Sequence, residues 1–442
     1  MRSVTNDRLR LIVLVSASVL MAHLCLWPRF DGMADGGLVL ASEIQNLKSE
    51  IQDGRGEQST EPHTSTEQAE RKELARQYSR GWYWFYFVNQ GYTFLMLFLI
   101  LWTGFSARLR RWAERATPRR WGIILIYSGL FMVLLAVLSF PLDIFAFWRE
   151  KRYGFATQNV TGWLGDELKE LGVALVLGLP AILVVYAVFK KAPRRWWFWG
   201  AGVLIGFVIF TVAITPVFIA PLFNTFEPLR DPTLRQRILT MAHEQGIPAD
   251  QVYQMDASRQ SRHTNAYVVG LLGTQRIVLY DTLLENYTPE EVEVVMGHEM
   301  GHYVLNHLWK GIGLASLLIL MGMWVLYRIM PSLLNRYQHR LGFKELTDVA
   351  SLPLLALLVS LSTFALDPIT NSFSRYQERQ ADLFALRAAP HPAAAVSAFE
   401  KFEMLDLSEA DPPAFIEFWL YSHPSPKHRI EMAKAFLSRP QL

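Results

Sequence analysis

The chain has 442 residues, of which 51% are hydrophobic, 13% are aromatic and only 19% are charged. This composition is apolar for a soluble protein and indicates a membrane protein. The formal net charge of +3, without a long basic stripe, argues against nucleic acid as a partner. The one cysteine, Cys25, excludes an internal disulfide framework and a cysteine-based metal site, so any metal ligands must be nitrogen and oxygen atoms.

Apolar runs long enough to cross a bilayer, which takes about 20 residues, recur along the chain. They predict about seven transmembrane helices, near 11–27, 82–105, 121–140, 172–189, 196–218, 311–327 and 350–366. Basic residues precede the first run, as in a signal peptide, but no small-x-small cleavage pattern follows it. We therefore expect residues 1–27 to be a retained anchor. The last run is short and ends in "ALDPIT".

Polar segments lie between these spans. Residues 28–81 are rich in Glu, Gln, Ser and Thr and predict a partly helical or disordered loop before transmembrane helices two to five at 82–222. Residues 223–310 and 368–442 are the two larger polar regions, and 311–367 holds transmembrane helices six and seven with their connecting loop.

Basic residues predict the orientation of the chain in the membrane. They cluster in three connections, as Arg108, Arg110, Arg111, Arg115, Arg119 and Arg120, then Lys190, Lys191, Arg194 and Arg195, then Arg328, Arg336, Arg340 and Lys344. With seven spans these connections lie on one side, which the positive-inside rule makes cytoplasmic. Both larger polar regions then face the opposite compartment. The run "REKR" at 149–152 lies on that opposite side and departs from the pattern.

The stretch "YTPEEVEVVMGHEMGHYV" predicts a helix with a defined start. Thr288 is a plausible N-cap, Pro289 occupies the first helical position, and Glu291 stands three residues after the cap, which together form a capping box. The helix therefore begins about ten residues before the first of the two histidines in the motif.

The sequence "HEMGH" in this helix predicts half of a zinc site. His298 and His302, four residues apart, project from one helical face and can bind the same ion, while Glu299 lies beside them. In the H-E-x-x-H arrangement zinc acidifies a water molecule and the glutamate acts as general base. The alternative is a chance occurrence on a helix that packs against the membrane.

A catalytic zinc needs a third protein ligand, with the fourth position left to water. The segment "NSFSRYQERQADLFAL" at 371–386 offers Glu378 and, one turn later, Asp382 on the same helical face. Glu378 would be the ligand, and Asp382 would accept a hydrogen bond from a ligand histidine and orient it. The alternative is a solvated acidic face paired with Arg375 and Arg379.

The stretch "NAYVVGLLGTQRIVLYD" contains two runs rich in β-branched and aromatic residues around a glycine-containing turn, which predicts a small antiparallel hairpin. Its exposed edge would suit a peptide bound as an added strand; a purely structural role is compatible with this. The expected fold class is therefore mainly α: a polytopic membrane protein with a zincin-like catalytic region that contains a small β-hairpin or sheet. Residues 223–310 and 368–442 would be its two catalytic segments.

Taken together, HEMGH, an apolar span and "SRYQERQAD" resemble the CAAX prenyl protease type I family, the a-factor-converting zinc endopeptidases, and related bacterial membrane metallopeptidases. Further blocks carry the resemblance over almost the whole chain: "YGFATQNVTGWLGDELKE" (153–170), "APLFNTFEPLRDPTLRQRI" (220–238), "SRHTNAYVVG" (261–270), "RIVLYDTLLE" (276–285) and "SHPSPKHRI" (422–430).

The resemblance implies one Zn²⁺ per chain, held by His298, His302 and Glu378, with Glu299 as base. It also implies that Asn265 and His423 lie near the substrate carbonyl, where side-chain N–H groups can donate to developing negative charge. Without the resemblance these two read as a turn residue and a surface histidine.

Arg429 is expected to support the site through a carboxylate such as Asp382, with a plain surface arginine as the alternative. His307 falls off the metal-facing stripe and is expected to be structural.

The expected partners are a peptide or protein substrate, prenylated or membrane-associated in the CAAX interpretation, and membrane lipid. Removal of C-terminal tripeptides from prenylated substrates is what the resemblance implies; general quality control of membrane proteins is an equally open role. We expect a bacterial inner (plasma) membrane with the catalytic side in the periplasm, although prenyl-processing members act from the cytosolic face.

Three other classes fit less well. A site-2-type intramembrane protease would bury its motif in an apolar span, whereas "TPEEVEVV" precedes this one with charges that each cost about 2.5–3.5 kcal/mol in a bilayer. A transporter would carry ionisable residues in mid-span, and these spans are mostly uncharged. The intact His298, Glu299, His302 and Glu378 argue against a non-catalytic scaffold.

Overall fold

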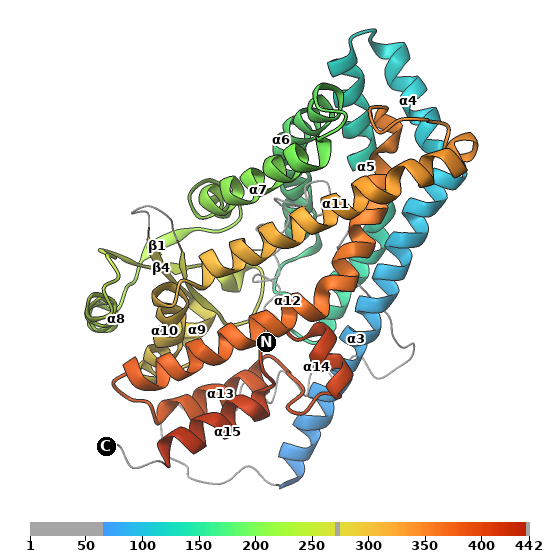
Figure 1. Cartoon of the computed structure of the whole chain (residues 1–442). Helices are drawn as coiled ribbons and strands as arrows, with labels where there is room; N and C mark the ends of the chain where they lie inside the picture. Colours follow the sequence, from blue (N-terminus) through green and yellow to red (C-terminus); the bar gives the residue numbers. More distant parts are fainter. Residues whose placement is uncertain (1–64, 270–274, 439–442) are drawn as a thin grey trace.

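The computed structural model describes residues 65–269 and 275–438, which form long helices and one small sheet (Figure 1). The elements run in the order α3 (Ser65–Trp102), α4 (Phe105–Ala116), α5 (Arg120–Arg152), α6 (Val160–Lys191), α7 (Trp196–Ile214), η1 (Thr215–Ile219), η2 (Ala220–Leu222), β1 (Phe226–Pro228), α8 (Pro232–Glu244), β2 (Val252–Met255), η3 (Ala257–Arg259), β3 (Ala266–Val269), β4 (Arg276–Tyr280), α9 (Asp281–Asn286), α10 (Pro289–Val304), α11 (His307–Leu341), η4 (Val349–Ser351), α12 (Leu352–Ala388), α13 (Ala394–Leu405), α14 (Ala414–Leu420) and α15 (Pro426–Leu437).

Within these residues, 6 helical segments are long and apolar enough to cross a membrane. They are Ala69–Trp102, Arg120–Arg152, Val160–Lys191, Trp196–Leu222, His307–Leu341 and Val349–Ala388. Five of them contain one of the predicted apolar runs, because polar turns continue the helices beyond the apolar core; the run 82–105 overlaps Ala69–Trp102 but extends past its end at Trp102. The other expected span, 11–27 in the anchor 1–27, lies outside the described residues.

Three of the expected boundaries, those after residues 81, 310 and 367, fall inside the helices α3, α11 and α12. α3 begins at Ser65, so the last part of the polar segment 28–81 is helical and continuous with the span that follows. α12 runs without a break through Pro368, where the span was expected to end. Membrane helices tolerate proline because neighbouring helices can satisfy the freed backbone groups. The C-terminal region expected from residue 368 therefore begins within a helix that also crosses the membrane.

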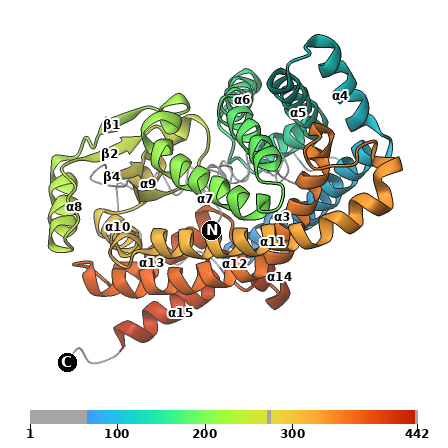
Figure 2. The ribbon, with the colours of Figure 1, turned by 45° about the horizontal axis from the view of Figure 1, so that its top comes forward.

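The spans form one end of the molecule and the sheet with its helices forms the other (Figures 1 and 2). α11 packs against α7, α12 against α3, and α6 against both α5 and α7. The sheet, α8, α10, α13 and α15 lie at the far end of α12 from α4.

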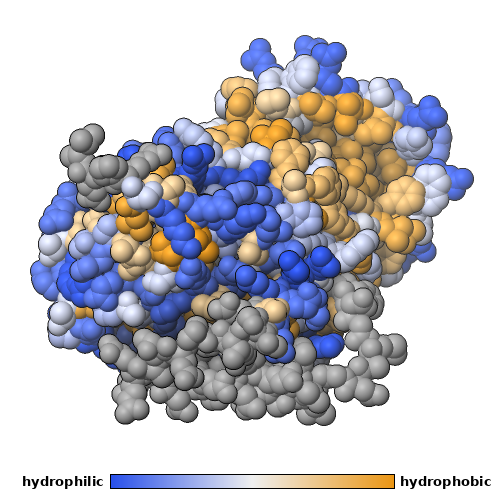
Figure 3. All heavy atoms as spheres, turned by 90° about the horizontal axis from the view of Figure 1, so that it is seen from below, coloured by the Kyte–Doolittle hydropathy of each residue, from blue (hydrophilic) through white to orange (hydrophobic). Residues whose placement is uncertain are grey.

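Large apolar side chains on the spans remain exposed, among them Val137, Val176 and Phe218. Figure 3 shows apolar residues gathered over one broad part of the surface, with polar residues over much of the rest of that face. An exposed apolar area of this kind on a helical bundle is the surface that lipid covers. Together with the spans, it makes the chain an integral membrane protein.

The sheet has four strands in the order β1-β2-β4-β3. The predicted hairpin is present: β3 pairs antiparallel with β4, from Ala266 opposite Leu279 to Val269 opposite Arg276. Its turn, at 270–274, lies outside the described residues. β4 also pairs in parallel with β2, which was not predicted from the sequence. β3 is therefore an edge of the sheet as far as the chain is described.

The helix α10 is held between this sheet and α12. Met296 and Met300 are fully buried in a core shared with strand residues such as Ile277 and Leu279. On its other side α10 approaches α12 closely at two glycines. A Cβ atom at Gly297 would lie 3.2 Å from the Cα of Ala385, and one at Gly301 would lie 3.2 Å from the Cα of Ala381.

Substitution of Gly301 by alanine should push α10 and α12 apart, because the added methyl group would also lie 3.1 Å from the Cβ of Phe384. We expect a loss of about 1–3 kcal/mol of stability from overpacking, seen as a lower thermal midpoint in detergent. The matched control is Gly313→Ala on α11, where nothing lies within 4 Å of the added atom. Equal midpoints for the two variants would contradict this account of the packing.

Candidate metal centre

The start of α10 is anchored by the predicted capping box. The Thr288 hydroxyl accepts a hydrogen bond from the Glu291 backbone N–H, and the Glu291 carboxylate accepts one from the Thr288 N–H at 2.8 Å. Lys401 of α13 donates to the same carboxylate at 2.6 Å. These contacts fix the start of the helix that carries the two histidines.

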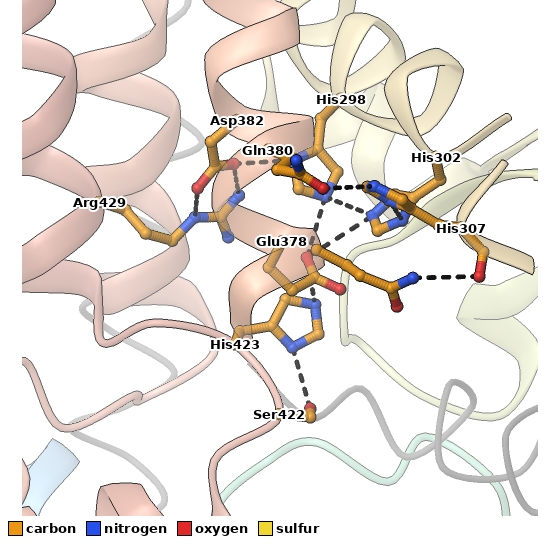
Figure 4. A network of polar contacts seen from close by, with 10 residues as sticks. His298, His302, His307, Glu378, Gln380, Asp382, Ser422, His423 and Arg429 are labelled. Atoms are coloured by element: carbon orange, nitrogen blue, oxygen red, sulfur yellow. Dashed lines mark hydrogen bonds and ion pairs between the residues drawn. The ribbon is translucent and has the colours of Figure 1, made fainter. Parts of the chain in front are cut away.

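His298 and His302 point from α10 toward Glu378 on α12 (Figure 4). The Nε2 atoms of the two histidines are 3.1 Å apart. Oε2 of Glu378 lies 3.1 Å from Nε2 of His298 and 3.6 Å from Nε2 of His302. One ligand atom from each residue lies within 4.8 Å of the other two. The three groups thus converge on one point, from elements about 80 residues apart in the sequence.

Asp382, one turn after Glu378, contacts the opposite side of the His298 ring. Its Oδ1 is 2.7 Å from Nδ1 of His298, and Arg429 of α15 donates from Nε to Oδ2 at 2.9 Å. Arg429 is itself buried, with its guanidinium 4.3 Å from the centre of the Phe399 ring. A carboxylate that accepts from Nδ1–H leaves the lone pair of a histidine on Nε2, the atom that faces Glu378.

The site favours positive charge. Burial alone would lower the pKa of His298, but the neighbouring Asp382 and Glu378 carboxylates raise it to about 10. A site that stabilises a proton on imidazole this strongly also suits a cation.

Burial raises the pKa of Glu299, which is half-buried beside the two histidines on α10. A raised pKa makes a carboxylate a better proton acceptor.

His423 reaches the same cluster from the C-terminal segment. Its Nε2 lies 3.1 Å from Oε2 of Glu378, and the Ser422 hydroxyl lies 3.1 Å from its Nδ1 (Figure 4). Arg375 holds this segment in place, since it donates to the backbone carbonyls of Glu417, at 2.8 Å, and Tyr421. The alternative in which Arg375 pairs with a solvated acidic face is therefore wrong: Glu378 and Asp382 are buried, and Arg375 caps α14 instead.

Asn265 directly precedes β3 and is buried. Its backbone carbonyl accepts from the Tyr280 N–H at 3.0 Å. Its side-chain Nδ2 has no hydrogen-bond partner among the described residues. No hydrogen bond joins it to the His298, His302 and Glu378 cluster in the parts of the chain described. The structure therefore places Asn265 just before the strand that packs against α10 and assigns it no role.

His307 is closer to the site than the sequence suggested. Its Nδ1 lies 3.0 Å from Nδ1 of His302, and its Nε2 lies 3.3 Å from Oε1 of Gln380 on α12. Helical periodicity predicted the position of His307 wrongly, because α10 ends at Val304. Asn306 then adopts a left-handed conformation (φ 56°), which redirects the chain. Asparagine is one of the few residues that adopt this conformation readily, so Asn306 could have indicated from the sequence that the helix ends before His307.

The donor set fits a divalent metal. Two imidazole nitrogens and one carboxylate oxygen are the ligands that catalytic zinc sites use, and the opposite ring nitrogens of both histidines have partners of their own. Together with the H-E-x-x-H pattern on α10, this donor set and the membrane spans are typical of a membrane-embedded metallopeptidase, an enzyme that acts on peptide or protein substrates.

Comparisons with known proteins identify the family. A family model described as "Peptidase family M48" matches residues 228–436, and one described as "CAAX prenyl protease N-terminal, five membrane helices" matches residues 57–225. A Bacillus subtilis protein described as "Uncharacterized metalloprotease YhfN" is 32% identical over 83% of this chain and 86% of its own. The CAAX prenyl protease 1 of Saccharomyces cerevisiae is 28% identical over 69% of this chain and 71% of its own.

The crystal structure of S. mikatae Ste24p has the same fold, with a TM-score of 0.74 at 23% identity, over 96% of this chain and 99% of that one. The chain belongs to peptidase family M48. It is a membrane metalloendopeptidase related to the CAAX prenyl proteases.

Proposed function

We propose that the chain is a zinc endopeptidase in which His298, His302 and Glu378 hold one Zn²⁺ and Glu299 is the general base. The observation that carries the proposal is the convergence of the three ligand atoms within 4.8 Å. Zinc bound there would supply Lewis acidity, polarising the scissile carbonyl and making a water molecule more acidic. Asp382, with Arg429, positions the His298 ring.

The chain's own residues would carry the proton transfers. Glu299 takes a proton from the attacking water and returns it to the leaving amine, for which its raised pKa is suited. His423, 3.1 Å from Glu378, and Asn265, whose buried Nδ2 has no hydrogen-bond partner among the described residues, would donate to the negative charge on the carbonyl oxygen. A substrate peptide aligned along the edge strand β3 would form backbone hydrogen bonds largely independent of its sequence.

The variant Glu299→Gln should keep its metal and lose about 10²–10⁴-fold in kcat, because only the proton acceptor is removed. His302→Ala should lose both the bound metal and the peptidase activity. Metal content of the purified protein and hydrolysis of a fluorogenic peptide measure the two effects. Glu290→Gln is the control, since it is on the same helix about 13 Å away along the axis. Unchanged hydrolysis in Glu299→Gln would remove the mechanism.

For the substrate class we propose CAAX-type C-terminal processing. Its support is the set of relatives named CAAX prenyl protease 1 and the matching N-terminal family model. General proteolysis of membrane proteins is the other candidate, because the Bacillus subtilis relative is described only as a metalloprotease.

Cleavage of one CAAX peptide with and without a farnesyl group separates the two. If the enzyme binds the lipid, burial of only about two methylene groups contributes about 1.6 kcal/mol, so the farnesylated peptide should have a kcat/KM at least about tenfold higher. Equal values for the two peptides would favour general proteolysis and leave the zinc mechanism intact.

We also propose that the catalytic end faces the periplasm of a bacterial inner membrane. The three basic connections meet at the opposite end of the bundle: Arg120 donates to the Thr347 carbonyl at 3.0 Å, and the Tyr186 hydroxyl lies 2.9 Å from that of Ser351. The exception at 149–152 is partly engaged by protein, since Arg149 stacks on the Tyr78 ring at 4.4 Å. The basic end would be cytoplasmic by the positive-inside rule.

Thiol labelling of intact cells tests this orientation. After Cys25→Ser, cysteines introduced at the exposed Arg230, between β1 and α8, and the exposed Arg115, on α4, report on the two ends. A membrane-impermeant maleimide should label Arg230→Cys in intact cells and Arg115→Cys only after permeabilisation. The reverse pattern would overturn the orientation.

A further inference from the structure

His307 stands where the chain turns from the metal-binding helix into a membrane span. It is the first residue of α11, after the left-handed Asn306, and only 4% of its surface is exposed. Its ring meets that of His302 nearly edge-on, with centroids 4.9 Å apart and planes at 75°. A buried imidazole in such contact with a candidate ligand needs a partner for each ring nitrogen.

Both nitrogens of His307 have such a partner. Nδ1 lies 3.0 Å from Nδ1 of His302, and Nε2 lies 3.3 Å from Oε1 of Gln380 (Figure 4). The backbone carbonyl of His307 accepts a hydrogen bond from Nε2 of Gln377 at 3.1 Å. Two glutamines that flank Glu378 on α12 therefore hold this residue.

The chain of contacts has one proton arrangement that serves metal binding. The Gln380 carbonyl oxygen can only accept, so His307 carries its proton on Nε2 and has a lone pair on Nδ1. That lone pair accepts from the His302 Nδ1–H. His302 is then left with a lone pair on Nε2, the atom that faces Glu378. With the opposite order, the His302 proton would sit on Nε2 and block a cation.

We propose that His307 is a positioning residue for His302: with Gln380, it keeps the His302 proton on Nδ1 and turns the Nε2 lone pair toward the metal. The inference rests on the proposed function, since it assigns the support of one proposed ligand. It also explains why "QERQAD" surrounds Glu378. Gln377 and Gln380 support His302 through His307, and Asp382 supports His298.

The test is Zn²⁺ affinity of the purified, metal-free protein, measured by competition with a chromophoric chelator, with no peptide present. His307→Leu should bind Zn²⁺ about 10–100-fold more weakly. His307→Gln, which keeps an acceptor and a donor on a side chain of similar reach, should recover most of that loss. His339→Leu, an exposed histidine near the far end of α11, should bind as the wild type does. The Co²⁺ absorption spectrum should change in His307→Leu and not in His339→Leu.

Unchanged Zn²⁺ affinity in His307→Leu would overturn the inference. The inference would also be overturned if His307→Leu and His307→Gln lost Zn²⁺ affinity equally and both metal-free variants had lower thermal midpoints. That result would mean that His307 serves only in packing. If His307→Leu does not fold, Gln380→Leu replaces it: a wild-type affinity there overturns the inference, and a loss of about tenfold supports it. If the wild-type protein binds no Zn²⁺, the proposed function itself is wrong. If the wild type binds Zn²⁺ and His307→Leu binds it equally well, only the inference about His307 is wrong.

Discussion

The close approach of α10 and α12 is the constraint on which the rest of the site depends. Gly297 and Gly301 present no side chain to α12, and Ala381 and Ala385 present the smallest one to α10. His298, His302 and Asp382 each directly follow one of these small residues, and Glu378 lies one turn before Asp382; these four residues meet between the helices. Small residues at this crossing thus set the separation between the helices, and that separation sets the distance between the metal-facing atoms.

α12 connects the site to the membrane because this one unbroken helix contains both an apolar span and the site residues Glu378 and Asp382. From Leu352 to Glu378 the helix advances about 39 Å along its axis, more than the about 30 Å of a hydrocarbon core. The start of α12 lies at the basic end of the bundle, so Glu378 is further along the helix axis from that end than a hydrocarbon core is thick. The charged turn that begins α10 can then remain outside the hydrocarbon.

Much of this architecture could be predicted from the sequence because it depends on local patterns. Apolar length identified the six spans that are described, and the capping box and the β3–β4 hairpin followed from spacing and residue type. Contacts between distant elements could not be predicted in this way. The continuation of α12 through Pro368, the parallel pairing of β2 with β4 and the role of Arg375 in holding α14 all depend on neighbours supplied by the fold. The position of His307 was predicted wrongly because the helical period was extended past Val304, where α10 ends, while its structural role stays a prediction.

Charge balance explains why the two candidate ligand histidines have unlike partners. Three carboxylates, those of Glu299, Glu378 and Asp382, interact electrostatically within the site, and Arg429 is the cationic side chain that offsets them. With the histidines set aside, the net negative charge of these four groups when all are ionised equals in size the charge of a divalent cation. A carboxylate behind His302, like the one behind His298, would add a charge that the cation could not balance. The uncharged pair of His307 and Gln380 gives His302 a hydrogen-bond acceptor without that cost.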